Sequence, residues 1–145
     1  MPETATAAGG KPLPVVSFLK IPETGSPYLE GLRCDECKAV FLDERTTCSS
    51  CGTRDKLSAL RLSDKGSLYV FSIVYRSFPG VKVPYISAIV DLEGGGTVKG
   101  NLVGIDPDPA KLKLGMAVRT IYEIAPIKDR AGNEYLTYYF TPQEA

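Results

Sequence analysis

Alternation of apolar and polar side chains dominates the chain from residue 66 onward and predicts β-strands. The expected strands are 67–78, 84–92, 97–105, 116–124 and 134–141. The first is apolar on both faces over most of its length, which predicts structure on both sides of it. Gly94 to Gly96 predict a hairpin turn, and Gly100 predicts a bend or a close backbone approach. Residues 106–109 (DPDP) predict a capped helical turn over 110–114.

The first part of the chain is organised around its four cysteines, which form the pairs Cys34 with Cys37 and Cys48 with Cys51. Tetrahedral zinc takes four thiolates at about 2.3 Å, and two tight pairs joined by a short hairpin supply them. Disulfides would require an oxidising compartment, and the sequence shows no export signal. Iron uses the same ligands and is not distinguished by sequence. Because four protein ligands close the coordination shell, the metal is expected to hold structure and not to perform chemistry.

The expected fold is mostly β, with an N-terminal zinc ribbon followed by a five-stranded OB-type barrel. Three strands, a short helical turn and two further strands are the order of such a barrel. The expected domains are a flexible N-terminal segment (1–27), a zinc ribbon (28–60) and an OB-fold domain (61–145). Residues 28–31 are expected to form one helical turn, and residues 54–63 a connection.

Composition excludes several kinds of function. The chain has 17 basic and 17 acidic side chains, whereas a non-specific nucleic-acid binder needs a basic excess. It has no histidine, which excludes Ser-His-Asp and Cys-His nucleophilic machinery and a His-ligated catalytic metal. If the cysteines bind metal, no thiolate nucleophile remains, so the chain by itself is not expected to be an enzyme. With no export signal and no stretch long enough to span a membrane, it is expected to be cytoplasmic.

The zinc ribbon and the barrel segments together resemble the zinc-ribbon/OB-fold acyl-CoA-associated family, long labelled a domain of unknown function. Besides the cysteines, the segments that carry this resemblance are 66–72 (GSLYVFS), 84–85 (PY), 100–103 (GNLV), 114–118 (LGMAV) and 140–142 (FTP). The resemblance covers about residues 28–142 and depends on the order and spacing of these segments. The N-terminal helix common in the family is reduced here to residues 26–31.

The resemblance implies a non-catalytic subunit that forms a hetero-oligomer with a thiolase-like catalytic subunit. Family members are similar to accessory subunits of acetoacetyl-CoA thiolase assemblies, of steroid side-chain aldolases, and of benzoylsuccinyl-CoA thiolase in anaerobic toluene degradation. Within the family, the overall look of the sequence and its stand-alone length favour the small subunit of benzoylsuccinyl-CoA thiolase. The resemblance thus implies carbon-carbon cleavage of a 3-oxoacyl-CoA by the complex, with structural Zn²⁺ and a coenzyme A thioester as the ligand of the complex.

Six residues are candidates for contact with acyl-CoA or the partner. Coenzyme A carries phosphates at one end and a thioester at the other, so its contacts need cations and apolar surface. The cations are Lys82, Lys99 and Arg130, and their alternative role is that of ordinary solvated loop charges. The apolar and aromatic candidates are Phe78, Val81 and Tyr85, which together with Val83 form an apolar tip between the first two strands. In OB barrels this tip is a binding loop, and its alternative role is an edge contact against the ribbon.

Two other functions stay open at this point. A nucleic-acid binder would stack bases on the aromatic residues of the last strand, although alternating aromatics are more often core: Tyr135, Tyr138, Tyr139 and Phe140. An independent enzyme would use carboxylates of the barrel, although isolated carboxylates are usually solvated: Asp91, Glu93 or Glu123.

Overall fold

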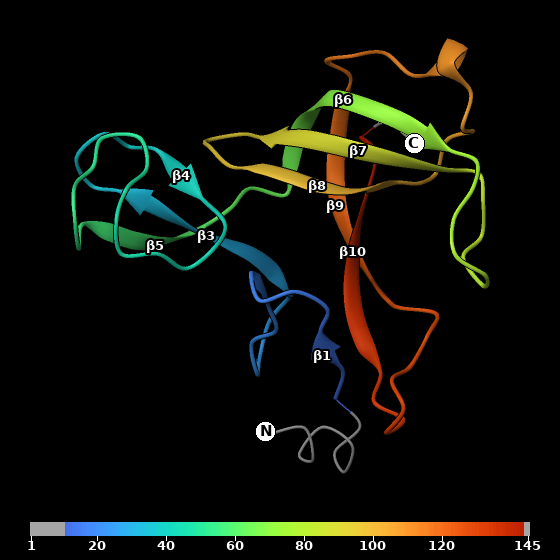
Figure 1. Ribbon diagram of the computed structural model, residues 1–145, viewed down its shortest axis with the longest axis horizontal. Helices are drawn as coiled ribbons and strands as arrows, with labels where there is room; N and C mark the ends of the chain where they lie inside the picture. The colour runs from blue at the N-terminus through green and yellow to red at the C-terminus, as the bar shows by residue number, and fades with distance from the viewer. Residues whose placement is uncertain (1–10, 144–145) are drawn as a thin grey trace.

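The computed structural model describes residues 11–143, which form two β modules side by side (Figure 1). The ribbon module is a four-stranded sheet of β2 (Leu19–Lys20), β3 (Tyr28–Cys34), β4 (Val40–Phe41) and β5 (Leu57–Arg61). The barrel module comprises β6 (Lys65–Val74), β7 (Tyr85–Leu92), β8 (Thr97–Leu102), β9 (Ala117–Ile124) and β10 (Tyr135–Pro142). β1 (Leu13–Pro14) is added to β10 at the barrel edge.

The barrel module closes on itself. β6 pairs with β7 and β9, β7 pairs with β8, and β10 pairs with both β8 and β9. The β8–β10 pairing is parallel, and the other pairings within the ring are antiparallel. This ring order is that of an OB-type barrel. The prediction of a mostly β fold, with a ribbon followed by a five-stranded barrel, is therefore confirmed.

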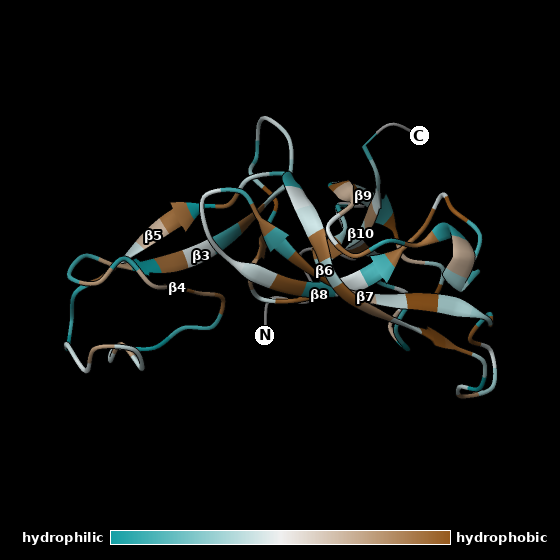
Figure 2. Ribbon diagram, turned by 90° about the horizontal axis from the view of Figure 1, so that it is seen from above, coloured by the Kyte–Doolittle hydropathy of each residue, from teal (hydrophilic) through white to brown (hydrophobic). Residues whose placement is uncertain are grey.

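One hydrophobic core connects the two modules. Apolar positions alternate with polar ones along the strands (Figure 2), and the inward side chains of β7, such as Ala88 and Val90, are fully buried. Three leucines that precede the barrel belong to the same cluster: Leu19, Leu29 and Leu62. At the joint, a Cβ on Gly95 would lie 2.7 Å from Cγ2 of Val40, so the glycine hairpin lets the ribbon approach closely.

A bulge in β6 explains its unusual apolar pattern. The register with β7 shifts between Leu68 and Val70, which leaves Tyr69 61% exposed. A bulge of this kind exchanges the two faces of a strand. Leu68 and Phe71 therefore both pack on the core, while Val70 is exposed. The prediction that structure covers both faces of this strand is wrong, because its apolar residues change face at the bulge.

The strand boundaries differ from the predicted ones where a pairing partner ends. β6 stops at Val74 because β7 begins opposite it at Tyr85, and residues 75–84 form a loop. The predicted close approach at Gly100 is confirmed, since a Cβ there would lie 2.8 Å from Cε2 of Phe140. The glycine hairpin is also confirmed by the hydrogen bond from the backbone N–H of Leu92 to the carbonyl of Gly96, 2.8 Å.

The start of the ribbon module is a strand and not a helical turn. Residues 28–31 begin β3, so the shortened family helix expected at 26–31 is absent from this part of the structure. β3 pairs with β5 over 30–34, and β5 lies in the segment expected to be a connection. Pairing between segments distant in the chain overrides the weak local pattern here.

Residues 11–27, expected as part of a flexible segment, cross from the barrel to the ribbon. β1 pairs with β10, and β2 pairs with β3. Between them, the ring of Phe18 lies 6.0 Å from that of Tyr138, and Leu19 is buried. These contacts hold the described part of the segment in place, because its apolar side chains cover the joint between the modules. Residues 1–10 lie outside the described residues.

Helical structure is limited to a short 3-10 helix, η1 (Pro109–Lys111), within the described residues. Its capping agrees with the prediction, since the carboxylate of Asp108 accepts a hydrogen bond from the N–H of Ala110, 3.0 Å. Between residues 11 and 143, no helix is long and apolar enough to cross a membrane.

Candidate functional site

The four cysteines converge at one end of the ribbon. The Sγ atoms of Cys34 and Cys51 are 3.7 Å apart, those of Cys37 and Cys48 are 3.5 Å apart, and all four lie within 4.8 Å of one another. A disulfide would require about 2.05 Å. Zinc–sulfur bonds of about 2.3 Å in a tetrahedron place the sulfurs about 3.8 Å apart. The sulfur positions therefore fit a tetrahedral metal ion held by soft ligands.

The two cysteine turns have the same backbone geometry. The N–H of Lys38 donates to the carbonyl of Cys34 at 2.9 Å, and the N–H of Gly52 donates to the carbonyl of Cys48 at 2.8 Å. Lys38 and Gly52 both have positive φ, 69° and 82°. The sequence suggests this conformation at the glycine but gives no sign of it at the lysine. The repeated turn directs both side chains of each pair toward one centre.

Hydrogen bonds to the sulfurs change their acidity. The backbone N–H of Cys51 lowers the pKa of Cys48, and the hydroxyl of Thr53, 3.0 Å from Sγ of Cys51, lowers the pKa of Cys51 to about 6. At Cys37 the N–H of Ala39 lowers the pKa, but desolvation and the three neighbouring sulfurs outweigh it and raise the pKa to about 11. Two sulfurs thus favour the thiolate, which is the form that binds metals.

Arg45 fixes the loop that carries the second cysteine pair. Its guanidinium bonds to the carboxylate of Asp43 at 2.6 Å and to the hydroxyl of Ser49 at 3.0 Å, and it lies 4.1 Å from the centroid of the Phe41 ring. The arginine holds the pKa of Asp43 below its usual value. Arg45 could not be predicted from the sequence, because no motif marks an arginine whose partners are set by loop geometry.

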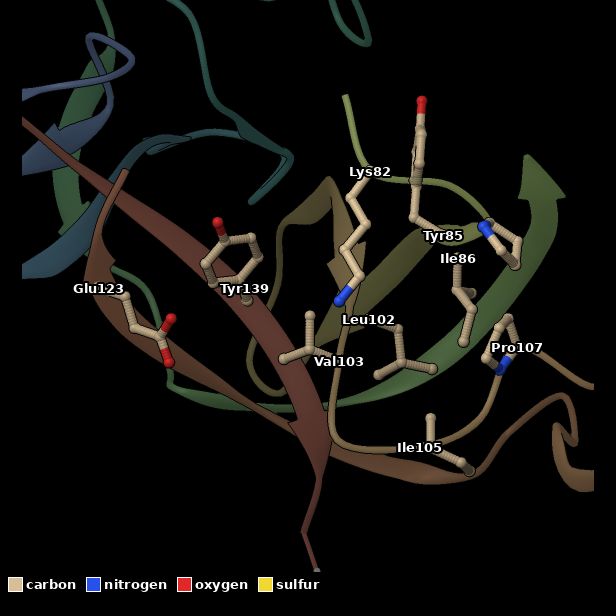
Figure 3. Close-up of a pocket in the computed structure, with 10 residues that line it drawn as sticks. Lys82, Tyr85, Ile86, Leu102, Val103, Ile105, Pro107, Glu123 and Tyr139 are labelled. Carbon is tan, nitrogen blue, oxygen red and sulfur yellow. The ribbon is translucent and has the colours of Figure 1, made fainter. Parts of the chain in front are cut away.

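A groove of about 570 Å³ opens in the barrel wall beside the β6–β7 loop (Figure 3). Its floor includes Ile86 and Leu102, which are buried, and its charged side chains are Lys82 and Glu123. Among the described residues, neither of these charges forms an ion pair. The remaining lining residues are Pro84, Tyr85, Val103, Ile105, Pro107 and Tyr139.

The groove exists because β8 and β10 meet at a single residue pair, Leu102 with Phe140. The N–H of Val103 donates to the carbonyl of Phe140 at 2.7 Å, and the chain then leaves the barrel wall. Side chains beyond this point line an opening. Its volume falls in the range of small-molecule sites, about 300–1,000 Å³, and an apolar floor with a few polar groups is their usual composition. The groove therefore suits an apolar ligand that carries an anionic or carbonyl group for Lys82.

The structure separates the six candidate contact residues into groups. Lys99 lies on the outer face of β8 beside a separate shallow hollow, and Arg130 lies in the β9–β10 hairpin at the bottom of Figure 1. Neither lines the groove. Their contacts with a ligand or partner, like those of the other four, stay predictions. The other four gather at the β6–β7 end of the barrel: Phe78, Val81, Lys82 and Tyr85.

Aromatic residues of β10 serve mainly the core. Phe140 is fully buried, and Tyr138 packs edge-on against it with ring centroids 5.9 Å apart. The hydroxyl of Tyr138 donates to the carbonyl of Lys99, and that of Tyr135 donates to Asp129. These rings do not form a row of exposed faces for base stacking, which removes the main structural argument for a nucleic-acid binder.

The three carboxylates considered for an independent enzyme lie in two separate hollows. Asp91 and Glu93 line one hollow, and Asp91 accepts a hydrogen bond from the hydroxyl of Thr97 at 2.8 Å. Glu123 lines the groove. The structure therefore separates Glu123 from the other two carboxylates.

Asp129 holds the β9–β10 hairpin together through hydrogen bonds, and its titration should make the stability of the hairpin depend on pH. Its carboxylate accepts two hydrogen bonds from Asn133, both 2.9 Å, and one from Tyr135, 3.0 Å. The Asn133 donors hold the pKa of Asp129 below its usual value. Because the pKa is lower in the folded state, this carboxylate stabilises the hairpin above its unfolded pKa, about 3.9, and loses that effect as the pH falls through the folded pKa.

We expect the exchange protection factor of the Asn133 amide to be high at pH 6 and to fall steeply below about pH 4. Asp129→Asn should lower protection at pH 6 and remove the pH dependence. Glu134→Gln removes the same charge from the same hairpin and should change little, since the side chain of Glu134 forms a long ion pair of 3.9 Å with Lys128. Equal protection of the unsubstituted hairpin at pH 3 and pH 6 would contradict this role.

Comparison with known proteins agrees with this architecture. Residues 60–122 match the family model described as ChsH2, C-terminal OB-fold domain. The chain is 31% identical over 113 residues to a DUF35 domain-containing scaffold protein of Methanocaldococcus jannaschii, covering 76% of this chain and 77% of that protein. It is 39% identical over 77 residues to benzoylsuccinyl-CoA thiolase subunit BbsA of Geobacter metallireducens, covering 52% of this chain and 51% of that protein.

Among solved structures, the Ltp2-ChsH2(DUF35) aldolase superposes with a TM-score of 0.60 and 26% identity, covering 79% of this chain and 84% of that chain. The resemblance stated from the residues is thereby confirmed. The similarity to the archaeal scaffold protein extends over about three quarters of both chains. The chain therefore belongs to the DUF35 family.

Proposed function

We propose that this chain is a non-catalytic, metal-stabilised accessory subunit of an acyl-CoA enzyme complex. The observation that carries the proposal is the ribbon-plus-barrel architecture, which it shares with a chain of the Ltp2-ChsH2(DUF35) aldolase at a TM-score of 0.60. Relatives named as a scaffold protein and as a thiolase subunit support the same role. In this proposal residues 28–60 are the zinc ribbon, residues 61–145 are the barrel domain, and the partner supplies the reacting groups.

Zn²⁺ is the ion that we assign to Cys34, Cys37, Cys48 and Cys51. The four sulfurs match the tetrahedral spacing, and four thiolates complete the coordination shell of zinc. Bound there, the ion would join the end of β3 to the loop that precedes β5. It would supply stability to the ribbon and take no part in the reaction.

The catalytic partner that we propose is a thiolase-like subunit that cleaves a carbon-carbon bond of a 3-oxoacyl-CoA. The 39% identity to BbsA supports benzoylsuccinyl-CoA, in the degradation of toluene, as the substrate of the complex. The aldolase structure supports an alternative, a subunit of a steroid side-chain aldolase, and an acetoacetyl-CoA thiolase complex is the third choice. All three substrates are thioesters of coenzyme A, so an accessory subunit could make the same contacts with each of them.

The groove is the part of this chain that we propose to contact the coenzyme A thioester. Ile86 and Leu102 offer an apolar floor, and Tyr85 stands at its side (Figure 3). The amine of Lys82 points into the groove, where it would pair with a carbonyl or phosphate oxygen. Lys99 and Arg130 lie away from it and are assigned no contact with this ligand.

The test is reconstitution. The tagged chain is purified from its native cells, co-purifying proteins are identified by intact mass, and zinc is measured. Partner and chain are then separated and recombined, and cleavage of benzoylsuccinyl-CoA and acetoacetyl-CoA is followed. We expect about one zinc per chain, and full activity only when both proteins are present. Turnover by this chain alone, or a partner that is fully active without it, would contradict the proposal.

Lys82→Ala provides the matched test of the groove. Loss of one hydrogen bond from a charged group, about 1.5 kcal/mol, corresponds to a rise of about tenfold in the KM of the recombined complex for the coenzyme A thioester. Lys128→Ala removes the same charge from the β9–β10 hairpin and should leave KM unchanged. Equal KM values for the two variants would show that the groove does not contact the substrate.

A further inference from the structure

The loop between β6 and β7 exposes four large apolar side chains. Tyr75, Phe78, Val81 and Val83 are 63%, 82%, 41% and 36% exposed. We call these four side chains the loop patch. They lie within ten consecutive residues, 75–84, and a cluster of this kind on a protein surface marks a binding site more often than scattered apolar residues do.

The backbone presents the patch in a defined conformation. The carbonyl of Phe78 accepts a hydrogen bond from the N–H of Val81, 3.1 Å. Pro79 and Gly80, with φ of +92° at the glycine, fill the central positions of this turn as a type II turn requires. The turn fixes the backbone next to Phe78 before any partner binds. Docking of Phe78 would therefore lose little further backbone conformational entropy.

The charge of the loop has one sign. Residues 75–84 contain Arg76 and Lys82 and no carboxylate, although the whole chain is neutral. Among the described residues, neither cation forms an ion pair. Because Lys82 points into the groove (Figure 3), Arg76 is the cation that the loop offers to a partner. An apolar loop that carries a positive charge is complementary to an apolar socket with carboxylates beside it.

The patch is continuous with the groove. Lys82 and Pro84, at the base of the loop, line the groove, so a partner seated on the patch would also cover the groove mouth. In Figure 1 the loop lies at the right-hand end of the longest axis, opposite the cysteine ribbon. A partner held there would leave the ribbon free.

We infer that the loop patch docks the catalytic subunit of the complex, which presents an apolar socket rimmed by carboxylates. This inference rests on the proposed function and names the surface that it uses. An anionic lipid surface would also attract an apolar loop with two cations. The catalytic subunit is favoured because Lys82 and Pro84 connect the patch to the groove that we propose to contact the thioester, so a partner seated there would bring its reacting groups to the groove mouth.

The test is photo-crosslinking of the full chain in its native cells. A benzophenone amino acid replaces Phe78 in one variant and Ile127 in another. Ile127 is 66% exposed on the β9–β10 hairpin and is the matched control. We expect position 78 to crosslink to the acyl-CoA enzyme subunit, at a peptide that contains apolar and acidic residues, and position 127 to give at least tenfold less product.

A second pair of variants measures the strength of docking. Phe78→Asp should weaken binding to the isolated catalytic subunit at least tenfold, while zinc content and melting temperature stay unchanged. Ile127→Asp should leave binding unchanged. Crosslinks from position 127 alone, no crosslink from either position, or binding to vesicles of phosphatidylcholine and phosphatidylglycerol that Phe78→Asp abolishes would overturn the inference. Crosslinking of position 78 to an unrelated protein would instead overturn the proposed function, and would leave the patch as a docking surface.

Discussion

Cys48→Ser is expected to abolish stoichiometric zinc binding and to unfold the ribbon module. The side chain is 1% exposed, and its Sγ lies 3.5 Å from that of Cys37 and accepts a hydrogen bond from the N–H of Cys51. A serine hydroxyl is a poor zinc ligand. The apparent free energy of zinc binding to small structural sites is about 10–16 kcal/mol at neutral pH. The pairing of a few short strands cannot compensate for a loss of that size. Zinc per chain, measured after gel filtration, should fall from about one to near zero.

Ser50→Ala is the matched control, because Ser50 lies between two ligands and is exposed. It should retain the metal and the melting temperature. Hydrogen exchange locates the damage in the Cys48 variant, where amides of β3 and β5 should lose protection and those at the β7–β8 ladder should keep most of theirs. A strong chelator should produce the same pattern in the unsubstituted chain. If Cys48→Ser keeps one zinc and normal exchange in β3, the structural assignment of the cluster is wrong.

Features set by neighbouring residues could be predicted from the sequence. The spacing of Cys34, Cys37, Cys48 and Cys51 predicted that they would converge, and the strand alternation predicted the barrel order. The close approach at Gly100 also follows from a local rule, because glycine inside a strand usually marks such a place. In each case the feature can be predicted from the residue type or its periodicity, without knowing which distant segment pairs with it.

Features set by distant pairing could not be predicted. β3 and β5 stabilise each other through pairs such as Cys34 with Leu57, and neither segment alone has a strong strand pattern. The bulge in β6 depends on where β7 pairs with it. The groove arises because β10 pairs with β8 at Phe140 alone, so the residues that line it come from four separate stretches of the described chain. Lys82 and Tyr85 could be selected from the sequence because they lie where the first two predicted strands are joined, which in OB barrels is a binding loop.

Phe140 lies in the core at the seam of the barrel, the place where β8 and β10 pair. Phe140→Ala is expected to lower the free energy of unfolding by about 3–5 kcal/mol. The side chain is 0% exposed, and its ring lies against Tyr138 and over Gly100. Gly100 has no side chain that could fill the space, and the β8–β10 pairing at this point holds the wall in place. The cavity would therefore persist. Phe140→Leu leaves a smaller cavity and should lose about 1–2 kcal/mol, which keeps the measurement possible if the alanine variant does not fold.

Phe78→Ala is the control with the same change of side chain at an 82% exposed position, and it should stay within about 0.5 kcal/mol of the unsubstituted chain. Urea unfolding followed by far-ultraviolet circular dichroism and tyrosine fluorescence suits a chain with eight tyrosines and no tryptophan. Free zinc must be held constant, because metal bound to the folded state adds to the apparent stability. Equal midpoints for Phe140→Leu and Phe78→Ala would mean that the seam between β8 and β10 does not depend on this ring. The groove would then have to be held open by the loop that follows β8, whose Ile105 and Pro107 line its far side.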